Sequence, residues 1–168
     1  MNLGFDASTT TVGWALSEDG KIKDAGFIDI SDIKPNREKA KLVIDKMKAH
    51  SLIDTVENIN LEDSLSGFAG PSSRTVVVML ARWNAIFEYA LEDAFGKKIN
   101  LVGAMTARKQ VLGAARLDGI KPKEFVKMKM DKMYDLTPWT VYNKKNNPDK
   151  RMEDVRDSIV ISLYNPIP

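Results

Sequence analysis

The sequence predicts an α/β domain with one mixed sheet, and three observations lead to it. Short alternating apolar runs open the chain, apolar residues at helical spacing follow, and strand-like and helix-like segments then take turns. The length of 168 residues suits one domain, expected over 1–168, and 43% hydrophobic residues can fill a core. We therefore expect three antiparallel strands and then parallel strands, flanked by helices.

The first half of the chain is predicted to hold four strands and one helix before a loop. Strands are expected at 3–7, 11–16, 21–30 and 56–61, because apolar residues dominate or alternate there and turn signals such as Asp19-Gly20 separate them. A helix is expected after Pro35-Asn36 and up to Ile53, since apolar residues recur there at helical spacing. A Gly-rich loop is expected at 64–73.

The second half is predicted to be mainly helical. A long helix at 74–95 ends at Gly96, and a brief strand follows at 99–102. Helices are expected at 106–112 and 121–134, then a long loop at 135–150 and a last helix at 152–164. The predicted order is βββ-α-β-α-β-α-α-α.

The residue inventory excludes several classes of site. The chain has no cysteine and a single histidine, His50, which we place on a helix surface. Disulfide scaffolds, thiolate sites and sites with several histidines are thereby excluded, so any chemistry must use carboxylates, hydroxyls, lysines or backbone. The absence of an apolar run of about 18 residues and of a signal-type N-terminus predicts a cytoplasmic protein without a membrane partner.

The net charge of +2 hides a strong division along the chain. Residues 1–96 carry 10 Lys and Arg against 15 Asp and Glu, whereas residues 97–151 carry 14 against 5. The last 17 residues are acidic again. A basic segment of this strength suits a polyanionic partner such as nucleic acid, although a solvated lysine-rich face explains it equally well.

Four acids stand where a structural role is hard to supply. Asp6 interrupts an apolar strand, Glu62 ends another, and Asp154 and Asp157 share one face of the last helix. Distant strands can lie side by side in such a sheet, and a helix packed on it can bring all four acids together. Each also has an ordinary alternative: a turn cap with Ser8 for Asp6, a surface acid for Glu62, and a helix-dipole role for the pair.

Four converging carboxylates repel one another unless cations neutralise them. Hard oxygen ligands favour Mg²⁺ or Mn²⁺ over zinc. Two such ions roughly 4 Å apart can activate water and stabilise a leaving oxygen in phosphodiester cleavage. This chemistry needs neither cysteine nor histidine.

These segments resemble RuvC-type Holliday junction resolvases of the ribonuclease H-like (retroviral-integrase) superfamily. The likeness covers the strand with Asp6 and its small residues, Ile59 to Asp63, Ala107 to Gly113, and Asp154 to Ser158, in that order. It implies the ribonuclease H-like fold and a bacterial or phage source. It also implies a Mg²⁺-dependent endonuclease for DNA recombination and repair, which resolves four-way DNA junctions as a homodimer.

The resemblance also assigns residue roles. Asp6, Glu62, Asp154 and Asp157 would bind two Mg²⁺ or Mn²⁺ ions per active site and carry the catalysis. Lys109 lies in the segment that resembles the family's DNA-binding stretch and would contact a phosphate. The basic segment adds one of Lys121 or Lys123 as a second phosphate contact, while Arg108 extends the basic patch and could equally belong to a solvated face. Family members often have an aromatic residue three positions after the catalytic glutamate; this chain has Leu65 there, and Phe68 is the candidate to replace it as a junction wedge.

Some features allow two interpretations. The helix at 74–95 is apolar on nearly every side, so either another helix of the chain covers the excess or a homodimer interface does. Phe125, Met128, Met130 and Met133 are interpreted as core filling, and Trp139 and Tyr142 as packing residues rather than base-stacking ones.

Other functions compete with the resolvase interpretation. A nuclease of the same fold could act on branched or flap DNA or on RNA–DNA hybrids. Gly4 to Thr10 also resembles the first phosphate loop of actin and sugar kinases, but the chain is too short for their second domain. An inert nucleic-acid-binding module would not need all four acids.

Overall fold

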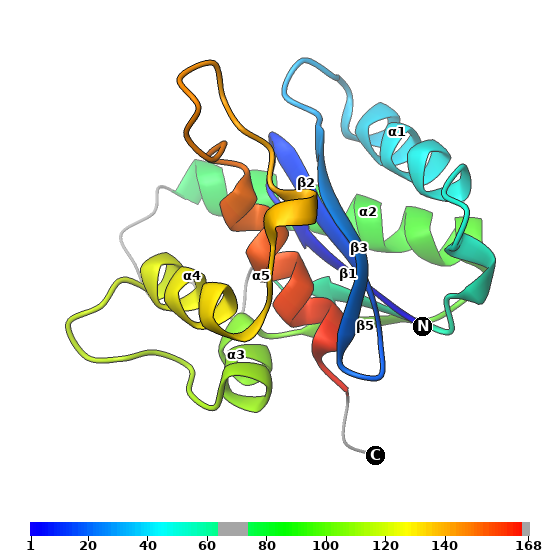
Figure 1. The fold of residues 1–168 in the computed structure, drawn as a ribbon. Helices are drawn as coiled ribbons and strands as arrows, with labels where there is room; N and C mark the ends of the chain where they lie inside the picture. Colours follow the sequence, from blue (N-terminus) through cyan, green and yellow to red (C-terminus); the bar gives the residue numbers. More distant parts are fainter. Residues whose placement is uncertain (64–73, 166–168) are drawn as a thin grey trace.

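A five-stranded sheet forms the centre of the molecule, in the order β3-β2-β1-β4-β5 (Figure 1). The computed structural model describes residues 1–63 and 74–165. Its strands are β1 (Asn2–Ala7), β2 (Thr11–Glu18), β3 (Lys21–Asp29), β4 (Asn58–Glu62) and β5 (Ile99–Val102). The first three strands are antiparallel, while β4 and β5 run parallel to β1, as the sequence predicts.

Helices cover both faces of this sheet (Figure 1). One face carries α1 (Asn36–Lys48) and α2 (Arg74–Phe95), and the other carries α3 (Ala104–Leu112), α4 (Pro122–Met133) and α5 (Met152–Leu163). Short 3₁₀ helices, η1 (Ile53–Thr55) and η2 (Thr137–Trp139), complete the described secondary structure. The predicted mixed α/β architecture is confirmed.

The alternation of side chains along the strands decides which face each residue serves. Leu3 and Phe5 of β1, with Ile59 and Leu61 of β4, are buried among α1 and α2. The residues between them face α5: Asn60 donates hydrogen bonds to the carbonyl oxygens of Ile161 and Tyr164, both at 3.0 Å. Asp6 and Glu62 continue this second set, so their side chains also point to the face that α5 covers.

Several predicted boundaries are wrong by a few residues. The first helix ends at Lys48, because the chain turns there and Ile53 enters η1 instead. The strand predicted at 56–61 occupies 58–62, and the helix predicted at 106–112 begins at Ala104. The loop predicted at 135–150 contains η2 and a hairpin closed by a bridge between Tyr142 and Pro148.

The expectation that His50 lies on a helix surface is also wrong. His50 follows α1 and is half-buried, with Nε2 at 2.8 Å from Oδ2 of Asp24 on β3. Its ring packs edge-on against Trp14, with the centroids 5.3 Å apart. His50 therefore fastens the end of α1 to the sheet.

The apolar surface of α2 is divided between the core and the outside. Trp83, Phe87 and Leu91 are fully buried, and Phe87 contacts Phe5 edge-on. Several other large apolar side chains of the helix are exposed: Val76, Val78, Met79, Ile86 and Tyr89. Among the described residues no helix covers Val78, Met79, Ile86 or Tyr89, so the interpretation that another described helix buries the excess is wrong for these four residues.

The methionines and aromatic residues of the second half of the chain differ in their burial. Phe125 and Met130 are buried as core filling predicts, but Met128 and Met133 are exposed. Trp139 packs against the core, whereas Tyr142 is 52% exposed. Within residues 1–63 and 74–165, the structure has no helix with the length and apolar character to cross a membrane.

Candidate active site

Asp6 and Glu62 lie side by side at the carboxyl ends of two neighbouring parallel strands. The register pairs Phe5 of β1 with Leu61 of β4, so the next residues of each strand are Asp6 and Glu62. Because side chains alternate along a strand, both carboxylates point to the face that α5 covers. Ser8 closes the following turn through Thr11, and Asp6 accepts no hydrogen bond from the described residues, so a turn-capping role for Asp6 is wrong.

Two glycines let α5 approach this part of the sheet closely. A Cβ built on Gly13 would lie 2.2 Å from the backbone oxygen of Asp154, and one on Gly4 would lie 2.3 Å from the backbone nitrogen of Ser162. Any side chain at these positions would push the helix away. Gly13 is paired with Asp6 across β1 and β2, so the close approach sets the first turn of α5 beside Asp6.

The four predicted acids thereby form one group, which we call the acid cluster: Asp6, Glu62, Asp154 and Asp157. Burial, together with the negative charges of Asp157 and Asp154, raises the pKa of Glu62 to about 7 against the opposing effect of Arg108. Burial, with repulsion from Glu62, Asp157 and Asp154, raises the pKa of Asp6 well above its ordinary value. The shifts show that the four charges interact.

The two acids of α5 behave in the same way. Burial raises the pKa of Asp154 to about 6, although Lys123 opposes the shift. Burial also raises the pKa of Asp157, against the opposing effects of Arg108 and Lys123. A group of acids that carries too much negative charge for its surroundings is typical of a functional site.

Two basic side chains partly neutralise the acid cluster. Nη2 of Arg108 on α3 donates to Oδ1 of Asp157 at 3.0 Å, and both side chains are nearly buried. Nζ of Lys123 on α4 lies 2.8 Å from Glu153 and 3.9 Å from Asp154. Arg108, expected to contact DNA, thus faces the acids in this structure, and so does Lys123.

The acid cluster has the donor atoms that a divalent cation requires. All four side chains offer hard oxygen atoms, which suit Mg²⁺ or Mn²⁺. Within the part of the chain that the structure describes, however, no group of three or more His, Asp and Glu side chains is arranged to hold a metal as it stands. Arg108 donates to Oδ1 of Asp157, one of the oxygens that would have to turn toward a bound cation.

The other predicted contact residues are spread around the cluster. Lys121 and Lys123 line a hollow of about 310 Å³ together with Glu153 and Asp157, so both lie beside the acids. Lys109 lies elsewhere: it lines a separate hollow with Gln110 and Tyr164, near the C-terminal end of α5. Its role in DNA contact stays a prediction. Phe68 and Leu65 lie outside the described residues.

Sequence reasoning missed several residues that shape this site. Nζ of Lys39 on α1 donates to the carbonyl oxygen of Thr9 and so fixes the turn after Asp6. Burial, with a smaller effect of Lys34, lowers the pKa of this nearly buried lysine. No sequence signal identified Lys39 or the Arg108–Asp157 pair. Gly13 did carry a signal, since a glycine inside a strand often marks a close backbone approach.

Comparison with known proteins gives structural matches only. No protein-family model matches the chain, and no curated protein is similar in sequence. The structure of Thermus thermophilus RuvC matches with a TM-score of 0.60 and 14% identity, over 96% of this chain and 90% of that one. The same protein in complex with a Holliday junction substrate gives 0.61 and 13%, with the same coverage.

A eukaryotic structure also matches. The yeast mitochondrial Holliday junction resolvase Ydc2 has a TM-score of 0.56 and 18% identity, over 96% of this chain and 75% of that one. Because these identities are low, the likeness concerns the arrangement of the elements. The chain therefore has the fold of the RuvC-type resolvases.

Proposed function

We propose that this protein is a metal-dependent endonuclease that resolves four-way DNA junctions. The observation that carries the proposal is the acid cluster, which brings four carboxylates together at the end of the sheet in a RuvC-type fold. Thermus thermophilus RuvC has been solved with a Holliday junction substrate, which supports branched DNA as the substrate here.

In this proposal, Asp6, Glu62, Asp154 and Asp157 hold two Mg²⁺ or Mn²⁺ ions. When bound, the ions supply water with a lowered pKa and positive charge for the leaving oxygen. The chain itself gathers the carboxylates, partly excludes water from them, and keeps Arg108 and Lys123 within reach. With the carboxylates neutralised by metal ions, Arg108 and Lys123 would be available to contact a DNA phosphate.

The proposed active form is a homodimer that nicks two opposed strands. The exposed apolar side chains of α2 are the candidate interface, because Val78 and Met79 are each 53% exposed on a helix that otherwise packs into the core. A symmetric dimer presents two acid clusters to a substrate with two-fold symmetry. This geometry suits paired cuts in one junction.

One cleavage experiment tests the proposal. The purified protein is incubated with a four-way junction, a flap, an RNA–DNA hybrid and a linear duplex, each with Mg²⁺, with Mn²⁺ or with EDTA. We expect paired nicks in the junction with either metal and none with EDTA. Preferred cutting of the flap or hybrid would instead support a related nuclease, and ATP turnover without cleavage would favour the kinase-like alternative.

A further inference from the structure

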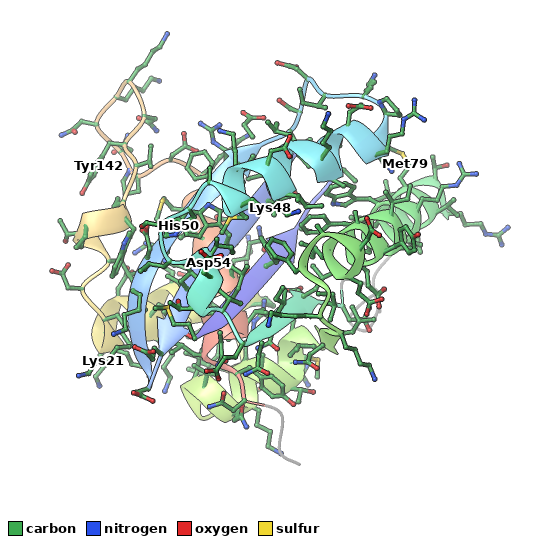
Figure 2. All side chains as sticks on the ribbon, turned by 90° about the vertical axis from the view of Figure 1, so that its right-hand side faces the viewer. Lys21, Lys48, His50, Asp54, Met79 and Tyr142 are labelled. Atoms are coloured by element: carbon green, nitrogen blue, oxygen red, sulfur yellow. The ribbon has the colours of Figure 1, made fainter. Side chains whose placement is uncertain are left out.

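A basic hairpin at 141–149 projects from the end of the molecule at which α5 begins (Figure 1). The N–H of Asp149 donates to the carbonyl oxygen of Val141, and the N–H of Asn143 donates to that of Asn147, both at 2.8 Å. Every residue from 141 to 148 is exposed. Figure 2 shows Tyr142 on this hairpin, set apart from the helices that cover the sheet.

The tip of the hairpin is ordered by its own hydrogen bonds. Oδ1 of Asn143 accepts from the backbone N–H groups of Lys145 at 2.9 Å and Asn147 at 3.2 Å. Asn146 adopts a left-handed conformation, with φ of 57°, which asparagine tolerates well in turns. The side chains at the tip are therefore carried on a pre-organised turn, which reduces the entropy lost on binding.

The base of the hairpin is tied to the sheet by one arginine. Arg151 pairs with Asp149 through two hydrogen bonds of 2.9 Å and 2.8 Å, and donates to Asp29 of β3 at 2.8 Å. Its guanidinium also lies 4.4 Å from the ring centroid of Phe27. We call Arg151, Asp149, Asp29 and Phe27 the Arg151 network. It holds the hairpin in a fixed direction relative to α5.

The two lysines at the tip of the hairpin have no acidic partner within the described part of the chain. Lys144 and Lys145 at the tip form no ion pair with a described residue, whereas the acids at the base are paired with Arg151. Beside the lysines stand the exposed phenol ring of Tyr142 and the amides of Asn146 and Asn147. Cations, amides and an exposed aromatic ring are the groups that contact nucleic-acid backbones and bases.

The base of the hairpin lies at the same end of the sheet as the acid cluster. A hollow of about 500 Å³ separates its base from the start of β2, and Thr10, Thr11, Asn143 and Lys150 line it. Thr10 belongs to the turn that follows Asp6, and Asp154 is in the first turn of α5, directly after the hairpin. Figure 1 shows the hairpin well apart from α4, the helix to which Lys123 belongs.

We propose that the hairpin at 141–149 binds the phosphate backbone of a duplex DNA arm, through Lys144 and Lys145, with Tyr142 in contact with the sugars or bases. The proposal rests on the proposed function for the choice of branched DNA. A substrate centred on the acid cluster then meets positive charge on two sides, from the hairpin and from Lys121 and Lys123. The hairpin would position an arm without reading its sequence.

A salt titration tests this inference without any cleavage. The full-length protein carries Asp6→Asn so that DNA is not cut, and its binding to a four-way junction and to a linear duplex is followed by fluorescence anisotropy. Lys144→Ala/Lys145→Ala is expected to weaken binding about tenfold at moderate salt. It should also lower the slope of log affinity against log salt by roughly 1 to 2, since each phosphate contact contributes about 0.9.

Matched variants separate a contact from a loss of net charge. Lys97→Ala/Lys98→Ala removes two adjacent exposed lysines just before β5, at the end of the sheet opposite to the acid cluster, and should leave binding unchanged. Lys144→Arg/Lys145→Arg should restore the salt slope. Tyr142→Ala is expected to weaken binding by about fivefold with the slope retained, because an aromatic contact releases no counterions.

The outcomes distinguish this inference from the proposed function. If the two alanine pairs lose affinity equally, or if neither loses any, the hairpin is no DNA contact and the inference is overturned, even where the wild-type protein cuts junctions. If the wild type binds the junction no better than linear duplex and cuts no junction, the proposed function fails, and the salt slope on duplex still decides the role of the hairpin. A protein that binds no DNA at all overturns both.

Discussion

Two groups of charged side chains lie beside the first turn of α5, the acid cluster toward β1 and β4 and the Arg151 network toward β3. In the Arg151 network each carboxylate has a basic partner, and hydrogen bonds from Arg151 lower the pKa of Asp149 to about 2. In the acid cluster four carboxylates share Arg108 and Lys123, and burial raises their pKa values. The first arrangement stabilises the native state, whereas the second stores electrostatic repulsion that a ligand can relieve.

The largest effect that this contrast predicts concerns cleavage. Asp6→Asn keeps the size of the side chain but removes a charge that the proposed metal needs, so cleavage of a junction should fall on the order of 10³-fold or more. Its binding to the junction should stay within a few-fold of wild type. Gel-based cleavage and anisotropy measure the two quantities.

The same substitution should increase stability, because it relieves repulsion among buried carboxylates. We expect the free energy of unfolding at pH 8 to rise by about 1 kcal/mol in metal-free buffer. An Asp6→Asn protein that still cuts a junction in Mg²⁺ would show that the acid cluster is not the catalytic centre.

A second prediction concerns a substitution that displaces α5, the helix that borders both regions. Gly13→Ala forces the first turn of α5 away from β2 and should reduce the free energy of unfolding by about 3 kcal/mol, the scale of an overpacked core. Gly4→Ala, which collides with the other end of α5, is the matched control. Urea unfolding should show a loss for both variants. Only Gly13→Ala is expected to weaken Mg²⁺-dependent stabilisation; an equal effect of both would contradict the placing of the acid cluster by Gly13.

Neutralising an acid at the base of the hairpin should reduce stability, whereas neutralising an acid of the cluster should increase it. Asp149→Asn leaves Arg151 without its two-point partner, so the free energy of unfolding should fall by about 1 kcal/mol. Urea unfolding at pH 7 measures the change. Cleavage should fall far less than for Asp6→Asn. If Asp149→Asn proved stabilising, the two regions would not differ in the way their pKa shifts indicate.

The smallest effect is a dependence of stability on pH. Glu62, with a pKa near 7 when folded and an ordinary value of 4.5, binds its proton more tightly in the folded state. The free energy of unfolding should therefore increase as the pH falls from 8 toward 5, by about 1 kcal/mol, and decrease as the pH rises through 7. Below pH 4 the free energy of unfolding should decrease again. The pKa of Asp149 is about 2 in the folded state and 3.8 ordinarily, so the unfolded chain binds this proton at a higher pH than the folded protein does.

Chemical denaturation in metal-free buffer at pH 8 and pH 5.5 measures this difference. Mg²⁺ should raise the stability at pH 8 more than at pH 5.5, because the cation competes with protons for the same oxygens. Glu62→Gln should reduce the difference between the two pH values. A wild-type protein that is equally stable at both would contradict the raised pKa of Glu62.

The sequence was sufficient to predict the order of the elements, because alternation and helical spacing are local properties of the chain. It also pointed to the four acids that the structure brings together, since Asp6 interrupts an apolar strand and Glu62 ends another, where a polar residue needs a reason. The sequence did not predict which basic side chains pair with these acids. Arg108 meets Asp157 only because α3 and α5 pack together, and nothing near Arg108 in the chain distinguishes it from the exposed Lys109.

The errors have the same origin. Ile53 fits the helical spacing of α1, but His50 bonds to Asp24 of β3 and the chain leaves the helix before reaching it. Met128 matches Met130 in composition, yet only Met130 faces α5 and the sheet. In both cases a contact between elements distant in the sequence decides where a helix ends or which side chain is buried. The local sequence pattern does not contain that information.

The assembly of the acid cluster from β1 and α5 has a consequence for biosynthesis. Asp6 is synthesised before β2 to β5, whereas Asp154 and Asp157 are synthesised after all five described strands of the sheet. Nascent chains that lack α5 hold only half of the carboxylates, and the face of the sheet around Gly4 and Gly13 stays uncovered. Under the proposed function, a truncated product that lacks α5 is therefore expected not to cut DNA, so the order of synthesis would delay activity until α5 has packed on the sheet.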